Sequence, residues 1–202
     1  MADLESSHVM LNVIKYLSTL LQRVAESNDA FISYTAQKAS IFHGLTRPTI
    51  SIQYYLERIF KYANCSPSCV VVAYIYLDRF TQKQPLLPIN SFNVHRLLIA
   101  SVLVSAKFMD DIFYNNAYYA KVGGISRDEM NLLEVDFLFG LGFQLNVTTS
   151  TFYTYCSYLQ REMLLQSPPL NVIPSPLNLG RTEKLHFCVN EEGSTHQHQL
   201  TV

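Results

Sequence analysis

Two consecutive segments of this chain are apolar around nearly their whole circumference, and this feature constrains the fold most. They are CVVVAYIYLDRF at 69–80 and HRLLIASVLVSAKFMDD at 95–111. A helix that is hydrophobic on all sides belongs inside a protein, so the two segments predict the hub of an all-α domain. Charge lies at the edge of this hub, at Asp78 and Arg79 in the first segment and at Lys107 in the second.

Local signals place further helices before and within the hub. Apolar residues at helical spacing predict amphipathic helices over about residues 8–25 and over 52–63. Ser66 and Pro67 suit an N-cap and a first helical position, so the first hub helix is expected to start there and to reach about residue 82. Asn90 or Ser91 is the expected N-cap of the second hub helix, which runs to about residue 110.

The signals after the hub predict three more helices. A short helix is expected over about residues 116–122, and Ser126 with Glu129 fits a capping box that starts the next helix, which Gly142 ends. A last helix is expected over about residues 150–163, followed by a proline-rich polar stretch. The predicted organisation is an N-terminal helical arm (1–29), a core domain (30–160) and a largely irregular tail (161–202).

Composition limits the classes of partner. The chain has 202 residues, of which 49% are hydrophobic and 15% charged, and its formal net charge is -1. This balance offers no basic field for a nucleic acid. No run reaches the roughly 18 apolar residues of a membrane span, so no membrane partner is expected. The four cysteines fit neither a disulfide framework nor zinc-site spacing, which predicts reduced thiols in an intracellular protein.

Four stretches, read with their actual residues, resemble a cyclin box. YIYLDRF at 74–80, LLIASVLVSAKFMDD at 97–111 and GGISRDEMNLLEVDFLFGLGFQLNV at 123–147 are similar to cyclin helices in residues and order. SIQYYLERIFKY at 51–62 resembles the plant P/U-type cyclins more narrowly, relatives of the phosphate-signalling cyclins. The resemblance covers roughly residues 30–160 and implies one five-helix box with an added helix on either side, because the chain is too short for a second box.

The resemblance implies a regulatory subunit that binds and activates a cyclin-dependent kinase, in the nucleus and/or cytoplasm. Lys107 and Glu134 match the kinase-contacting Lys and Glu of the family. We expect Phe108, Leu133 and Phe137 to be their apolar neighbours at the docking face. The implied context is the cell cycle or nutrient- and phosphate-linked growth signalling.

Asp78 and Arg79 match a structural motif of the cyclin family rather than a docking motif. In cyclins this Asp usually pairs with an Arg of the first box helix, and SIQYYLERI has no Arg at the corresponding place. Arg47 and Arg58 are the substitutes available, and the sequence does not choose between them.

Two other functions compete with the kinase-binding hypothesis. A cyclin-fold adaptor in transcription, without a kinase partner, is the alternative, although it normally needs a basic surface. An enzyme is not expected, because the chain has no glycine-rich phosphate loop, no nucleophile elbow and no metal-spaced carboxylates or histidines. We therefore expect no cofactor, no metal and no small-molecule substrate.

Overall fold

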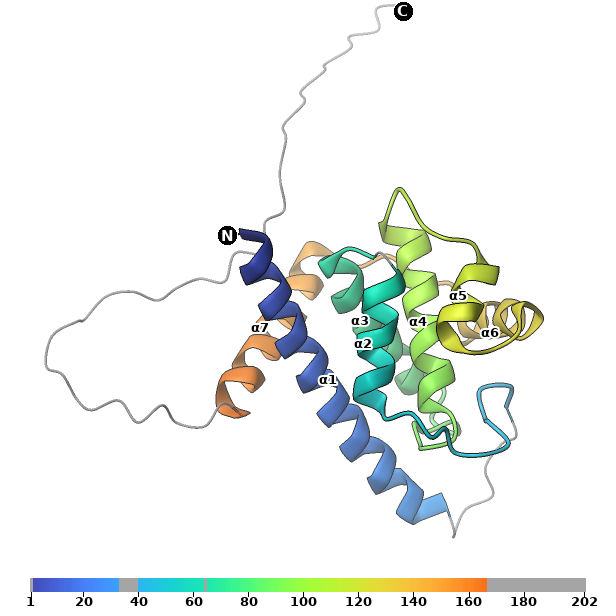
Figure 1. Cartoon of the computed structure of the whole chain (residues 1–202). Coiled ribbons are helices and arrows are strands. Elements are labelled where there is room, and N and C mark those ends of the chain that lie inside the picture. Colours follow the sequence, from blue (N-terminus) through green and yellow to red (C-terminus); the bar gives the residue numbers. More distant parts are fainter. Residues whose placement is uncertain (1, 33–39, 64, 167–202) are drawn as a thin grey trace, which may run out of the picture. The chain divides into compact units, whose positions relative to one another are not determined.

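A computed structural model describes residues 2–32, 40–63 and 65–166, and this part of the chain is all-helical (Figure 1). Its helices are α1 (Ala2–Ile32), α2 (Ile52–Ala63), α3 (Pro67–Lys83), α4 (Val94–Met109), α5 (Asn116–Gly123), α6 (Arg127–Leu141) and α7 (Thr149–Gln166). The described residues contain no β-strand. The prediction of an all-α fold is confirmed for this part of the chain.

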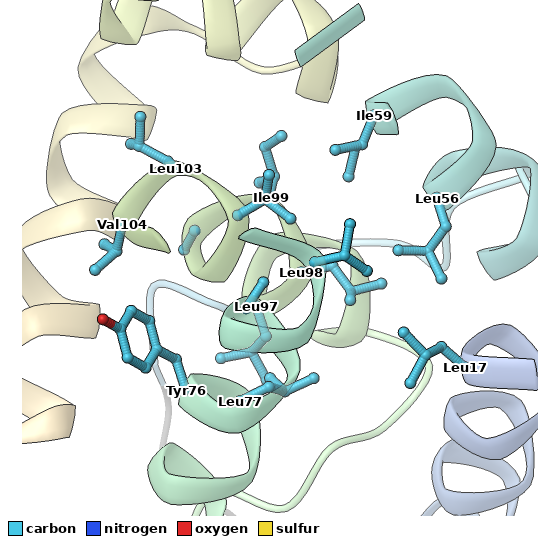
Figure 2. Packing of buried hydrophobic residues seen from close by; sticks show 14 of the residues in the cluster. Leu17, Leu56, Ile59, Tyr76, Leu77, Leu97, Leu98, Ile99, Leu103 and Val104 are labelled. Carbon is cyan, nitrogen blue, oxygen red and sulfur yellow. The ribbon is translucent and has the colours of Figure 1, made fainter. Parts of the chain in front are cut away.

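The two apolar segments form α3 and α4, which pack against each other at the centre of the fold (Figure 1). Almost every α4 side chain from Val94 to Ala106 is buried, the exceptions being His95 and Arg96. Figure 2 shows the surrounding contacts, in which Leu17 of α1 and Leu56 of α2 point toward the same apolar cluster. Each such aliphatic side chain contributes about 1.5–3 kcal/mol on burial, so the hub supplies much of the driving force for folding.

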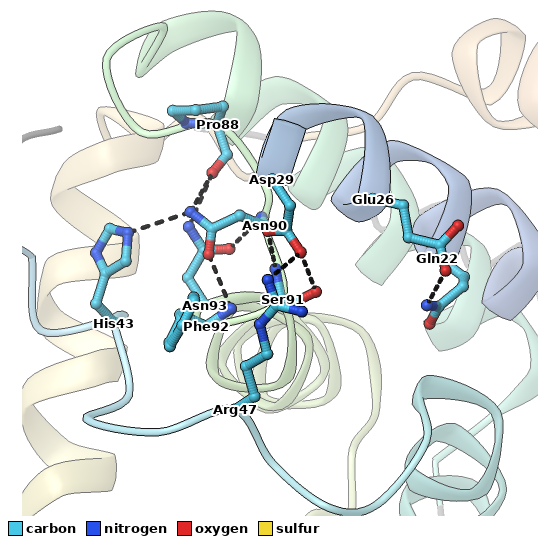
Figure 3. Close-up of polar contacts among 10 residues, drawn as sticks. All are labelled: Gln22, Glu26, Asp29, His43, Arg47, Pro88, Asn90, Ser91, Phe92 and Asn93. Atoms are coloured by element: carbon cyan, nitrogen blue, oxygen red, sulfur yellow. Dashed lines mark hydrogen bonds and ion pairs between the residues drawn. The ribbon is translucent and has the colours of Figure 1, made fainter. Parts of the chain in front are cut away.

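The α1 helix extends beyond the predicted range of 8–25 because its C-terminal polar residues bind other parts of the chain. Asp29 accepts hydrogen bonds from the backbone N–H and the hydroxyl of Ser91, at 3.0 and 2.6 Å (Figure 3). Asn28 donates to the carbonyl of Ile89 at 2.7 Å, and Arg47 pairs with Asp29 at 2.9 Å. These side chains look like a helix stop in the sequence, but they hold the helix end onto the turn before α4.

The α4 helix starts at Val94, and the predicted cap at Asn90 or Ser91 is wrong. Asn90 begins a tight turn instead, because its backbone N–H donates to Asn93 Oδ1 at 2.8 Å and its own Oδ1 accepts from Phe92 at 2.9 Å. Asn93 is the N-cap residue, and its side chain makes no capping bond. Figure 3 shows Asn90 and Asn93 folded back toward the carbonyl of Pro88.

The position of α6 is set by a close approach to α3. Gly140 faces the ring of Phe80, and a Cβ atom there would lie 2.1 Å from a ring carbon. The Phe80 ring stacks on Phe137 with centroids 4.9 Å apart. At the end of α6, Gly142 has a φ of 60° and forms the predicted C-terminal cap, while Lys83 donates to the carbonyl of Leu141 at 2.7 Å. Glycine, the stacked rings and Lys83 together fix the register of α6 on the hub.

The predicted segment boundaries fall inside helices. The boundary between residues 29 and 30 lies within α1, whose buried apolar side chains between Val13 and Ala25 belong to the common core. The boundary between residues 160 and 161 lies within α7, and most of the predicted tail lies outside the described residues. Cys65, Cys69 and Cys156 are free thiols, and Cys188 also lies outside the described residues.

Candidate functional site

Three helices meet at a polar centre on the surface formed by α4, α5 and α6. Lys107 Nζ lies 2.7 Å from Glu134 Oε1, and Asn116 Nδ2 donates to Glu134 Oε2 at 2.6 Å. The Lys107 side chain is 29% exposed and the Glu134 side chain 16%. Asn116 also donates to Asn131 Oδ1 at 2.8 Å. The two predicted charged residues are therefore brought together, joined by an asparagine that the sequence did not point to.

Local structure explains how each member reaches this centre. Lys107 lies in the last turn of α4, where the helix dipole favours a cation. Glu134 lies in the second turn of α6, whose start is fixed by Ser126 accepting a hydrogen bond from the Glu129 N–H at 3.1 Å. Asn116 is the first residue of α5, immediately after its N-cap. Lys107 and Asn116 can both bind Glu134 because the helices of the three residues, α4, α5 and α6, pack on one another.

Exposed apolar side chains accompany the polar centre on α4, on the loop after it, and on α6. On α6 they recur at i, i+3 and i+7, which is one stripe of the helix. We call Lys107, Glu134 and these exposed side chains the docking face; its apolar members are Phe108, Met109, Ile112, Phe113, Leu132, Val135 and Phe139. Large exposed apolar side chains on the same helices as a charged pair are typical of a surface that binds another protein.

The α6 helix ends in a further exposed aromatic residue with an unusual backbone. Phe143 has a φ of 56°, in the left-handed region that a bulky residue seldom adopts. Its N–H donates to the carbonyl of Leu138 at 3.0 Å, and its ring meets Phe139 edge to face at 5.2 Å. The helix-end bonds thus hold Phe143 against the end of the exposed α6 stripe.

Of the predicted apolar neighbours, only Phe108 lies on the surface, at 49% exposure. Leu133 and Phe137 are completely buried, so their prediction as docking residues is wrong. Both belong to the inward stripe of α6 with Met130 and Leu141, and Phe137 stacks on Phe80. Leu133 directly precedes Glu134, and adjacent residues of a helix point about 100° apart, so its side chain turns toward the hub while that of Glu134 reaches Lys107.

Asp78 binds Tyr155 of α7 and not an arginine. The Tyr155 hydroxyl donates a short hydrogen bond to Asp78 Oδ2, and Gln82 donates to the same oxygen at 2.9 Å. Both proposed substitutes bind elsewhere, since Arg47 pairs with Asp29 and Arg58 donates to the carbonyl of Lys121. Asp78 therefore holds α7 against α3.

Arg79 joins the hub to the chain segment after α6. Its guanidinium donates to the carbonyls of Gln144 and Asn146, at 3.0 and 2.9 Å. Tyr76 supports the same segment by donating to the carbonyl of Leu145 at 2.7 Å. Arg79 thus has a structural role close to the end of the docking face.

The described part of the chain gives little support for a metal site, for catalysis by a histidine or for a membrane span. It contains no group of three or more His, Cys, Asp or Glu side chains arranged for a metal ion. Burial lowers the pKa of His43 and of His95, which favours the neutral form of both rings near pH 7. None of the described helices combines the length and the apolar character needed to cross a membrane.

Comparison with known proteins is consistent with this architecture. The cyclin family model matches residues 8–145. Cyclin-U4-1 of Arabidopsis thaliana is 64% identical over 202 residues, covering 98% of this chain and 96% of the relative. Cyclin-P4-1 of Oryza sativa subsp. japonica is 55% identical over 194 residues, covering 93% of this chain and 87% of the relative. The family match, these identities and the all-helical fold agree with one another: the chain belongs to the cyclin family and matches its plant P/U-type members.

Proposed function

We propose that this cyclin binds a cyclin-dependent protein kinase through the docking face and activates it, without being an enzyme itself. Cyclins are regulatory subunits, which sets the class of function. The observation that carries the proposal is the Lys107–Glu134 pair, 2.7 Å apart, which joins α4 and α6, two helices that also expose large apolar side chains. A charge pair in such surroundings favours one partner in one orientation, while the apolar side chains supply binding area.

Activation follows from what a kinase requires. Its strand lysine must pair with the glutamate of its mobile αC helix before the nucleotide phosphates are held correctly. The docking face is carried by α4 and α6, which the hub holds rigidly through Phe80, Phe137 and Gly140. A rigid face pressed against αC would shift that helix toward its active position. The proposal includes action in the nucleus or cytoplasm, in cell division or in nutrient- and phosphate-linked growth signalling.

Capture by a panel of plant cyclin-dependent kinases tests the proposal. We expect the wild-type chain to co-purify with at least one kinase and to raise its activity on a peptide substrate. The Lys107→Ala, Glu134→Ala double variant should lose capture, because it removes both charged groups that are proposed to orient the kinase on the docking face. The cyclin without a kinase should phosphorylate nothing.

A second ion pair between the same two helices provides a matched control. Arg96 of α4 pairs with Glu129 of α6, and both side chains are partly exposed. The Arg96→Ala, Glu129→Ala variant also removes an α4–α6 ion pair, but it leaves the docking face intact, so it should still capture the kinase. If the folded wild type captures no kinase of the panel, kinase binding is refuted and the transcription-adaptor alternative becomes the leading hypothesis.

A further inference from the structure

Asn116 engages the carboxylate that the docking face depends on. A side-chain amide nitrogen carries two hydrogens, and Asn116 Nδ2 has two acceptors, Glu134 Oε2 at 2.6 Å and Asn131 Oδ1 at 2.8 Å. The opposite orientation of the amide would place an oxygen against the carboxylate. Both hydrogens therefore have partners, and Asn116 links α5 to α6 through two separate bonds.

These bonds leave Glu134 with a single arrangement. Lys107 occupies Oε1 and Asn116 occupies Oε2, so each carboxylate oxygen is held from a different helix. A free glutamate side chain samples several rotamers, and this freedom must be given up when a partner binds. A side chain already fixed in its bound conformation avoids that cost, which increases affinity.

We propose that Asn116 is a positioning residue of the docking face, which acts by holding the Glu134 carboxylate in place for the partner. This inference rests on the proposed function, because it assumes that Glu134 contacts the kinase. Asn116 acts through Glu134 and need not touch the kinase. Asn131 supports it by fixing the other hydrogen of the same amide.

A purely structural role at the start of α5 is the competing explanation. The capping bond of α5 is made by a different residue, since Asn115 Oδ1 accepts from the Tyr118 N–H at 3.0 Å. Asn116 follows the cap, and both of its described side-chain bonds lead to α6. A structural role would make Asn116 important whether or not Glu134 is present, whereas a positioning role would not.

The test measures Asn116→Ala in two backgrounds, by titrating the kinase that the wild type captures. In the wild-type background we expect about tenfold weaker binding. In the Glu134→Ala background we expect no further change beyond about twofold, because nothing remains to be positioned. Gln53→Ala is the matched control, since Gln53 donates to Glu57 at 2.9 Å on an exposed face of α2 and should leave binding unchanged.

The same two backgrounds are compared by urea unfolding of the cyclin alone, which keeps the inference separate from the proposed function. Asn116→Ala should lower the unfolding midpoint of the wild type and have a much smaller effect in the Glu134→Ala background. An equal loss in both backgrounds, in binding or in unfolding, would overturn the positioning role. If no kinase is captured at all, the proposed function fails, and the unfolding comparison still decides whether Asn116 holds Glu134.

Discussion

Replacing Gly140 with alanine tests the close approach that positions α6, and with it the docking face. The added Cβ atom would lie 2.1 and 2.7 Å from two carbons of the Phe80 ring. Carbon atoms in contact normally lie about 3.5–4.0 Å apart, so the ring or the helix must move by more than about 1 Å. The ring has little room, because it stacks on Phe137 and meets Phe42 edge to face at 5.3 Å.

The magnitude follows from two opposing terms. Overpacking a filled core typically costs about 1–3 kcal/mol, and the confined ring places Gly140→Ala at the upper end. Alanine in a helix interior recovers up to about 1 kcal/mol relative to glycine. The expected net loss of unfolding free energy is therefore about 2 kcal/mol, which corresponds to a decrease in Tm of roughly 4–8 °C for a domain of this size.

Thermal and urea unfolding, followed by circular dichroism, measure this loss. Gly124→Ala is the matched control, since its Cβ would meet no atom within 4 Å and only its φ of 72° opposes the change. Gly124→Ala should lower the unfolding free energy by about 1–2 kcal/mol, because alanine is less stable than glycine in the left-handed conformation. In a Phe80→Leu background the Gly140→Ala cost should largely disappear. A Gly140→Ala variant as stable as the wild type, or equally destabilised in both backgrounds, would refute the packing argument.

Three further results are expected from the same structure. Tyr155→Phe removes the hydroxyl that binds Asp78 and should lower the unfolding free energy by about 1.5–3 kcal/mol; an unchanged urea midpoint would contradict the bond. Because burial lowers the pKa of His95, the unfolded chain takes up the proton more readily, and stability should fall as the pH decreases below about 6.5. In urea unfolding at a series of pH values, His95→Gln should reduce this loss of stability at low pH. Identical pH profiles for the variant and the wild type would contradict the role of His95. Phe108→Ala should weaken kinase capture and change the unfolding free energy by no more than about 0.5 kcal/mol. Leu133→Ala should lower the unfolding free energy by about 2–5 kcal/mol, because that side chain is buried; the reverse pattern would contradict the placement of Phe108 on the surface and of Leu133 in the core.

Signals contained within a few residues predicted much of the fold correctly. The apolar stripe gives the bounds of α2, and the caps at Ser66, Ser126 and Gly142 are formed as expected. The uniformly apolar segments become the buried α3 and α4. In each case the deciding interaction, a capping bond or burial of a periodic face, is local enough to be read from the sequence.

The incorrect predictions depend on contacts between distant residues. The α1 helix continues past its polar residues because Asp29 binds Ser91. Asp78 binds Tyr155, which lies 77 residues away in the sequence, and not an arginine. Leu133 lies in the core and not at the docking face, because its stripe of α6 packs on the distant hub residues. Asn116 carried no signal, since one asparagine beside another at a helix start predicts a cap and not a link to α6.

Hydrogen exchange of the cyclin, alone and saturated with a captured kinase, tests docking through this face most directly. Binding should slow exchange in residues 107–116, at the end of α4 and in the loop that follows, and along the exposed stripe of α6. The outward face of α1 should exchange at an unchanged rate and serves as the internal reference. Slowed exchange confined to α1, α2 or α7, with residues 107–116 unchanged, would contradict the proposal that Lys107 and Glu134 lie at the kinase interface.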